Sequence, residues 1–124
     1  MSAPNILNVT SITGKSFYLA LSDTNATELI SNPASSDKVI KINMIQIANV
    51  DPALGCNVTV DYHDAASIGG TPYSLVANLN VPAKASIVAL DKNTSLYLEE
   101  DRSISVTAET SDHLEVIISY EEIS

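Results

Sequence analysis

The sequence has no tryptophan, a single phenylalanine and a single cysteine, Cys56. Without large aromatic side chains, a hydrophobic core in this chain has to be filled by isoleucine, valine, leucine and alanine, and β-branched side chains favour strands. One cysteine cannot form an internal disulfide, so we expect a fold that does not depend on an oxidising compartment. The alternation of apolar and polar residues places Cys56 on the apolar side of its segment, and we interpret it as a buried, unreactive thiol.

Basic residues are also scarce, with 6 lysines and arginines against 15 acidic residues and a formal net charge of −9. The acids are concentrated in residues 91–124, which hold nine of them. Nucleic acids and anionic membranes are bound by basic surfaces, so this balance argues against both as partners. We interpret the acids first as a source of solubility, with docking onto a basic partner surface as the alternative.

Long hydrophobic runs are missing as well. No apolar run approaches the roughly 18 residues that a membrane-spanning helix needs. The first residues contain neither a basic segment nor an apolar one, so we expect no secretory signal and synthesis in a cytoplasm. Because 124 residues is the usual size of one domain, we expect a single domain over residues 1–124 with a short N-terminal arm over about residues 1–5.

Apolar and polar residues alternate through most of the chain, which is the period of a strand with one buried face. The pattern is clearest in residues 93–124, where short polar turns separate three alternating runs. The apolar positions there are Leu96, Leu98, Ile104, Val106, Ala108, Leu114, Val116, Ile118 and Tyr120. This pattern predicts a three-stranded antiparallel meander, with the intervening Ser103, Ser105 and His113 in water.

Further strand candidates precede this stretch, and no segment has the period of an amphipathic helix. They cover residues 6–12, 17–21, 38–50, 56–63, 73–81 and 87–90, with a turn at 13–15 and an ambiguous segment at 26–30 that fits a strand or one helical turn. Within 38–50 the apolar positions change parity after Met44, which indicates either a β-bulge or a strand buried on both faces. The spacing predicts an all-β, two-sheet antiparallel sandwich of about nine short strands, either jelly-roll or immunoglobulin-like.

Candidate catalytic groups are few. Asp61 and His63 lie on the polar face of a predicted strand, which we expect to be solvated. They would suit a Ser-His-Asp arrangement, but no Gly-X-Ser-X-Gly nucleophile turn accompanies them. The Gly69-Gly70-Thr71 stretch lacks the lysine and the following helix of a phosphate-binding loop. We therefore predict no enzymatic activity and no catalytic or cofactor-binding residue.

A cluster of carboxylates occupies one predicted turn, at Glu99, Glu100 and Asp101. Calcium prefers several such oxygen ligands, but the Asp-X-Asp-X-Asp-Gly spacing of a calcium loop is absent. A solvated turn is therefore our first interpretation, with no metal-binding residue, and a calcium site is the alternative.

Several strand and turn segments between residues 38 and 123 together resemble small virion structural proteins of tailed bacteriophages. They are Val-Ile-Lys-Ile-Asn at 39–43, Val-Thr-Val-Asp-Tyr at 58–62, Val-Pro-Ala-Lys-Ala-Ser at 81–86, Leu-Tyr-Leu-Glu-Glu at 96–100 and Leu-Glu-Val-Ile-Ile-Ser-Tyr-Glu at 114–121. The resemblance implies a β-sandwich that binds other virion proteins without catalysis and is located in the virion. We expect a capsid decoration, or cement, protein that binds across capsid subunits, in many copies or as a homo-oligomer.

Two alternatives remain open at this point. A neck, tail or fibre-attachment protein would bind neck or tail proteins in place of the major capsid protein. A carbohydrate- or receptor-binding module would instead need exposed aromatic platforms. Alternation places Tyr62, Tyr73 and Tyr120 inside, which leaves Tyr18 and Tyr97 as the exposed tyrosines.

Overall fold

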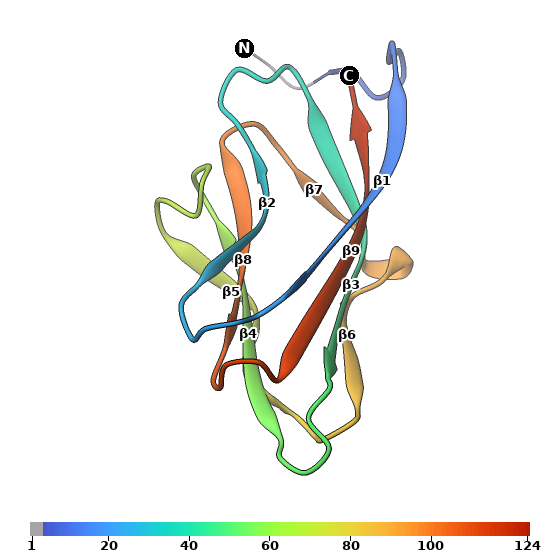
Figure 1. The fold of residues 1–124 in the computed structure, drawn as a ribbon. Coiled ribbons are helices and arrows are strands. Elements are labelled where there is room, and N and C mark those ends of the chain that lie inside the picture. The colour runs from blue at the N-terminus through green and yellow to red at the C-terminus, as the bar shows by residue number, and fades with distance from the viewer. Residues whose placement is uncertain (1–3) are drawn as a thin grey trace.

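Two antiparallel sheets pack face to face in the computed structural model, which describes residues 4–124 (Figure 1). Sheet A consists, in spatial order, of β1 (Ile12–Ala20), β9 (Leu114–Ile123), β3 (Val39–Asn49) and β6 (Ser86–Leu90), and β7 (Leu96–Leu98) also pairs with β3. Sheet B consists of β2 (Thr27–Asn32), β8 (Arg102–Ala108), β4 (Cys56–His63) and β5 (Pro72–Val81). A single short 3-10 helix, η1 (Lys92–Thr94), accompanies these nine strands in the described residues. The predicted all-β sandwich is therefore confirmed.

The strand order is that of a jelly roll, one of the two kinds of sandwich expected. The chain passes from one sheet to the other at most connections, so strands that follow each other in sequence usually face each other across the core. The predicted meander is therefore wrong, because β7 and β9 lie in sheet A while β8 lies between β2 and β4 in sheet B. Alternation shows which side of a strand is buried, but it does not show which sheet the strand belongs to. Two strands in one sheet and two strands that face each other across the core have the same alternating pattern.

The core lies between the sheets and is filled by the branched aliphatic side chains that the composition predicts. The predicted core positions Leu114, Val116 and Ile118 of β9 are all buried, and Cys56 belongs to the same cluster. No helix among the described residues is long enough and apolar enough to cross a membrane.

A β-bulge in β3 explains the change of parity in residues 38–50. The pairing of β3 with β9 shifts register between Ile42 and Met44, so Asn43 is the extra residue. The shift keeps Ile42 before the bulge and Ile45 after it on the core side, and both are fully buried. Of the two interpretations left open by the sequence, the bulge is the one observed.

The N-terminal part of the chain differs from the prediction. Residues 6–11 form no strand, and β1 begins at Ile12 and continues through the predicted turn at 13–15. It pairs with β9 from Ile12 to Ala20 without a register shift. These backbone hydrogen bonds keep residues 13–15 extended in place of the predicted turn. The ambiguous segment at 26–30 is strand from residue 27 onward, within β2. Of the arm expected over residues 1–5, residues 1–3 lie outside the described part.

Strand β5 is far less buried than its alternation predicts. Tyr73 was expected inside, but it is 61% exposed, and Leu79 is 47% exposed. These two residues pair with Tyr62 and Val58 of β4, whose side chains lie on the core side of sheet B. The core side of β5 therefore extends past the area that sheet A covers.

Candidate interaction surface

His63, predicted on a solvated face, is instead a buried structural residue and only 7% exposed. Its Nε2 lies 2.8 Å from Ser105 Oγ, and its Nδ1 lies 3.3 Å from the Gly69 carbonyl oxygen. The prediction that Ser103 and Ser105 are in water is also wrong, because both are buried. The loop at residues 64–71 covers this part of the outer face of sheet B.

Hydrogen bonds between the loop backbone and the Ser103 side chain hold that covering loop on the sheet. The Ile68 amide donates to Ser103 Oγ at 2.8 Å, and the same hydroxyl donates to the Ala65 carbonyl oxygen at 2.7 Å. Gly70 has a φ of +66°, and a Cβ there would clash with Asp64 Oδ1, which accepts the Thr71 amide, so the loop favours glycine at this position. The small side chains of the loop let its backbone approach the sheet, and this run of small residues is the sequence signal that could have indicated a covering loop.

Asp61 does not join His63 in a catalytic arrangement. Its Oδ1 accepts a hydrogen bond from Ser74 Oγ of β5 at 2.7 Å. His63 is bonded to a serine and a carbonyl group, so no carboxylate orients its ring as a Ser-His-Asp triad requires. The two residues therefore stabilise local structure.

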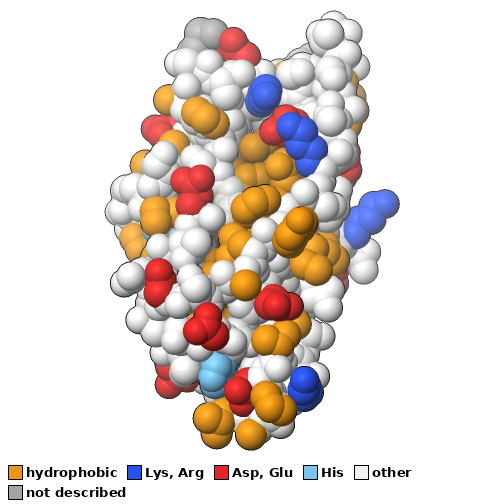
Figure 2. Space-filling view, viewed as in Figure 1, with side chains coloured by type: hydrophobic (Ala, Val, Ile, Leu, Met, Phe, Trp, Pro, Cys, Tyr) orange, Lys and Arg blue, Asp and Glu red, His pale blue; other side chains and the backbone are white. Residues whose placement is uncertain are grey.

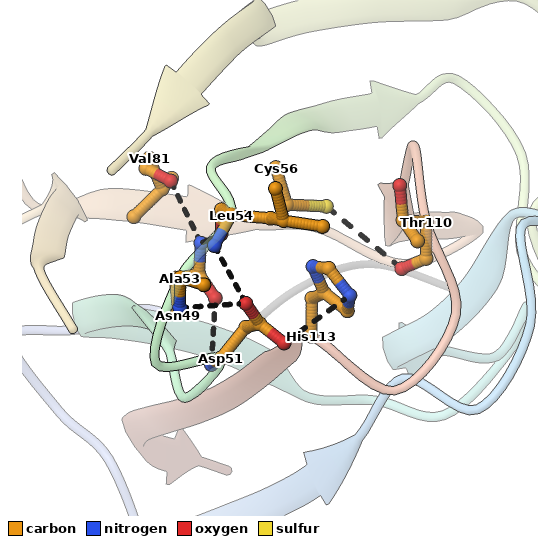
Figure 3. A network of polar contacts seen from close by, with 8 residues as sticks. All are labelled: Asn49, Asp51, Ala53, Leu54, Cys56, Val81, Thr110 and His113. Carbon is orange, nitrogen blue, oxygen red and sulfur yellow. Dashed lines mark hydrogen bonds and ion pairs between the residues drawn. The ribbon is translucent and has the colours of Figure 1, made fainter. Parts of the chain in front are cut away.

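The turn after β3 carries a second polar network (Figure 3). Asp51 Oδ2 accepts the amides of Ala53 at 2.9 Å and Leu54 at 2.6 Å. These two amides hold the pKa of the Asp51 carboxyl below its ordinary value. The other carboxylate oxygen lies 3.6 Å from His113 Nε2, and Figure 3 shows Asp51 between the turn and the His113 ring. His113, predicted in water, is half-buried here.

Cys56 lies in the same region and is fully buried, as predicted. Its thiol donates to the carbonyl oxygens of Asn57, at 3.6 Å, and Thr110, at 3.8 Å. A catalytic cysteine needs access to substrate and a base that takes its proton, whereas carbonyl groups only accept the hydrogen bond. This arrangement packs the thiol and does not activate it.

Two buried asparagines, which the sequence analysis did not single out, join the two sheets. Asn49 at the end of β3 donates from Nδ2 to the Val81 carbonyl oxygen of β5 at 2.9 Å. Asn32 at the end of β2 donates from Nδ2 to the Leu98 carbonyl oxygen of β7 at 3.0 Å. Both side chains are almost completely buried. An asparagine that ends an alternating strand was the available signal for these contacts.

The acidic turn at 99–101 ties neighbouring loops together. Glu100 Oε2 accepts the Asp37 amide at 3.0 Å, and Asp101 Oδ1 accepts the Ala66 amide at 3.0 Å. Among residues 4–124, no group of three His, Cys, Asp or Glu side chains is close enough to hold a metal ion. The calcium interpretation therefore gains no support from the geometry.

The outer face of sheet A carries a row of four side chains, one each from β1, β9, β3 and β6, of which three are apolar and exposed. Tyr18, Ile117 and Val88 stand in one line with Gln46, each directly opposite the next. The three apolar members are 76%, 48% and 55% exposed, respectively. Beside this outer row lies a hollow of about 470 Å³, and the next row lines it with Ala20, Glu115 and Ala48. The outer row is a regular apolar surface with no partner within the described residues.

The edge strand β1 exposes a second kind of apolar surface. Phe17 pairs with the fully buried Ile118, so its side chain lies on the core side of sheet A, yet it is 44% exposed. Figure 2, in the same view as Figure 1, shows hydrophobic side chains gathered along the middle of the visible face, over β1 and the opening between the sheets. Alternation identifies the core side of a strand but does not show how far the opposite sheet extends, so sequence reasoning missed this surface.

Comparison with known proteins identifies the fold and no family. No protein-family model and no curated protein matches the chain. Among solved structures, the chain is similar to one from the Bacillus endospore appendages that form a novel family of disulfide-linked pili. The TM-score is 0.54 at 10% sequence identity, over 92% of this chain and 88% of that chain. At this identity the likeness shows a shared β-sandwich, and function has to be argued from the surface.

Proposed function

We propose that the protein is a non-enzymatic structural subunit of a tailed-phage virion, a decoration protein that attaches in many copies to the capsid through the outer face of sheet A. The outer row of Tyr18, Ile117 and Val88 carries this proposal. Tyr18 and Ile117 are direct neighbours, and Gln46 separates them from Val88. Exposed apolar side chains that gather on one face mark an interaction site, because water solvates them poorly. Sheet A holds these side chains in fixed positions, so a partner can match their shape.

The state of the polar groups supports a structural role. His63, Asp61 and Cys56 are engaged in hydrogen bonds that hold loops and packing, and the acidic turn at 99–101 joins two loops. The resemblance of residues 38–123 to virion proteins supports the same role. The structural neighbour belongs to a pilus, which is itself a multi-copy assembly. That pilus is disulfide-linked, whereas the only cysteine here is buried, so attachment of this protein would be non-covalent.

Burial of the outer row is the source of the proposed binding energy. A fully buried aliphatic or aromatic side chain contributes about 1.5–3 kcal/mol to binding. The translational and rotational freedom lost on association opposes this gain. A standard interface buries about 800 Å² on each partner, roughly one eighth of the 6523 Å² surface of this protein. Salt screens charges within about 3 Å at 1 M but does not weaken apolar contacts. Attachment through Tyr18, Ile117 and Val88 should therefore withstand salt, and Glu115 in the next row is the one acid beside them in the sheet.

Co-sedimentation with particles of the cognate phage that lack this protein tests the proposal. Wild-type protein should bind saturably, with little change in 1 M salt, and Ile117→Asp should bind at least about tenfold more weakly, because it puts a charge into an apolar contact. Leu54→Asp is the matched control, since Leu54 is 62% exposed but lies in the turn after β3, away from the outer row. It should bind like the wild type.

Other outcomes separate the alternatives. Binding to isolated necks or tails and not to capsids would replace decoration by a neck, tail or fibre-attachment role. A lack of binding to capsids, necks and tails at every salt concentration would contradict a virion role and favour a receptor-binding module. Unchanged binding of Ile117→Asp would show that the outer row is not the contact.

A further inference from the structure

The 15 acidic residues are absent from two long segments, residues 1–22 and 65–90. These segments contain the two longest edge strands, β1 with 9 residues and β5 with 10, whereas the other edges are formed by shorter strands. Strand β5 contacts β6, so β5 and β6 form one side of the sandwich and β1 and β2 form the other. Two copies with a net charge of −9 repel each other, chiefly where acidic side chains face one another. Each side of the sandwich has a long edge strand without acidic residues, where this repulsion is weakest.

Strand β1 also lacks the usual protection of an exposed sheet edge. Edge strands are commonly shielded by proline, by bulges or by several charged side chains. Strand β1 contains no proline, its pairing has no register shift, and its single charged residue, Lys15, forms an ion pair with Glu122 at 2.9 Å. An edge of this length and composition is suited to contact with another protein.

The two long edges project on opposite sides and from different sheets. On one side, sheet A projects at β1 and exposes the core-side ring of Phe17. On the other side, sheet B projects at β5 and exposes the core-side groups of Tyr73 and Leu79. If two copies lie side by side, the projecting strand of one can rest on the projecting strand of the other, so that the apolar core continues from copy to copy.

We propose that copies of this chain associate head to tail through this lap joint, with Phe17 of one copy packed against Tyr73 and Leu79 of the next. The two surfaces differ, so an open assembly of any length keeps one free β1 edge and one free β5 edge, and association continues into chains or closes into rings. The proposal goes beyond attachment to a virion, because it concerns a separate surface and a different partner.

The size of the joint sets the strength of the association. Nine residues span about 30 Å, and one strand is about 5 Å wide, so the joint covers about 150 Å² on each copy. This area is well below the roughly 800 Å² of a standard stable interface. Association should therefore be weak and concentration-dependent in solution, and it should be reinforced where copies are already held side by side.

Sedimentation velocity over a wide range of protein concentration tests the joint. The wild type should form species larger than a dimer at high concentration, while Phe17→Asp and Leu79→Asp should each remain monomeric at concentrations where the wild type associates. Ile117→Asp is the control, because it places the same charge on an exposed apolar residue of the outer row, and it should associate like the wild type. Circular dichroism and thermal melts of each variant establish that it is folded.

Mixing the two edge variants gives a result that misfolding cannot produce. Phe17→Asp keeps an intact β5 edge and Leu79→Asp keeps an intact β1 edge, so their mixture should form a one-to-one dimer and nothing larger. A wild type that stays monomeric at every concentration, edge variants that associate like the wild type, or a mixture that stays monomeric would each overturn the proposal. Virion binding of the same variants is measured separately, so failure of the joint and failure of the proposed function are distinguishable.

Discussion

Replacement of Asn49 by alanine removes the amide that joins the ends of β3 and β5. Its Nδ2 donates to the carbonyl oxygens of Val81 and Leu54, both at 2.9 Å, and its Oδ1 accepts the Asp51 amide at 2.9 Å. The side chain is 2% exposed. Water can replace the lost partner of the two groups in the turn, but the Val81 carbonyl lies inside and would be left unpaired.

The loss of stability follows from these three bonds. A buried polar group left without a partner costs about 1–3 kcal/mol, and each bond that water can replace costs about 0.5 kcal/mol at the lower end of the usual range. The expected destabilisation of Asn49→Ala is therefore about 2–4 kcal/mol. With a urea dependence of about 2 kcal/mol per molar, the middle of the typical range, the unfolding midpoint should fall by roughly 1–2 M.

The variant Asn49→Asp separates hydrogen bonding from side-chain volume. It keeps the shape of the side chain but directs a carboxyl oxygen at two carbonyl oxygens in a buried site. Burial and the facing dipoles should raise the pKa of the new carboxyl above the unfolded value of about 3.9. When the folded-state pKa is raised, stability is greatest below the unfolded-state pKa and is lost as the pH rises toward and through the folded-state pKa. The deficit of Asn49→Asp should therefore grow from about pH 4 to pH 7, while that of Asn49→Ala stays nearly constant.

Urea denaturation followed by circular dichroism at several pH values measures both effects. Asn25→Ala is the control, because Asn25 is an exposed residue of the turn before β2, and its change should stay within about 0.5 kcal/mol. The reasoning is refuted if Asn49→Ala also lies within about 0.5 kcal/mol of the wild type. It is equally refuted if Asn49→Asp and Asn49→Ala have parallel pH profiles.

Two further predictions concern the core and an ion pair. Ile118→Ala should cost about 2–5 kcal/mol in chemical denaturation, because Ile118 is fully buried, and a loss under about 0.5 kcal/mol would show that the wrong face had been assigned to the core. Lys15→Gln removes the side-chain hydrogen bond and charge that hold the pKa of Glu122 below its ordinary value of 4.5. A lowered carboxyl pKa stabilises the fold above the unfolded-state pKa, and this stability is lost as the pH falls through the folded-state pKa. Lys15→Gln should therefore melt below the wild type at pH 7, and the difference should shrink as the pH falls below 4.5. A difference of constant size at every pH would exclude a charge effect.

The core could be predicted from the sequence wherever a strand is covered along its whole length. Strands β8 and β9 are central in their sheets, and their alternating residues such as Val106 and Val116 are fully buried, as predicted. The bulge at Asn43 was visible because an extra residue changes the parity of the apolar positions after it. Alternation could not identify neighbouring strands, since partners such as β1 and β9 come from opposite ends of the chain.

The same pattern failed where burial depends on distant segments. Tyr73 was predicted inside but is exposed because sheet A does not reach it, and Ser105 was predicted in water but is buried because a loop covers it. The outer row of the candidate interaction surface was hidden for a related reason. Tyr18, Ile117 and Val88 become neighbours only through the register of three strand pairs, which no local pattern contains.

The central position of β9 determines when the protein can fold during its synthesis. Ile12 pairs with Ile123, and β9 separates β1 from β3 in sheet A. Until the ribosome has made residue 123, β1 has no partner strand, and β3 has an unpaired edge beside an open core. Folding that waits for such distant contacts is slow, and the incomplete chain exposes surfaces that aggregate. A stop codon at position 114 should therefore be as harmful as one much earlier in the gene.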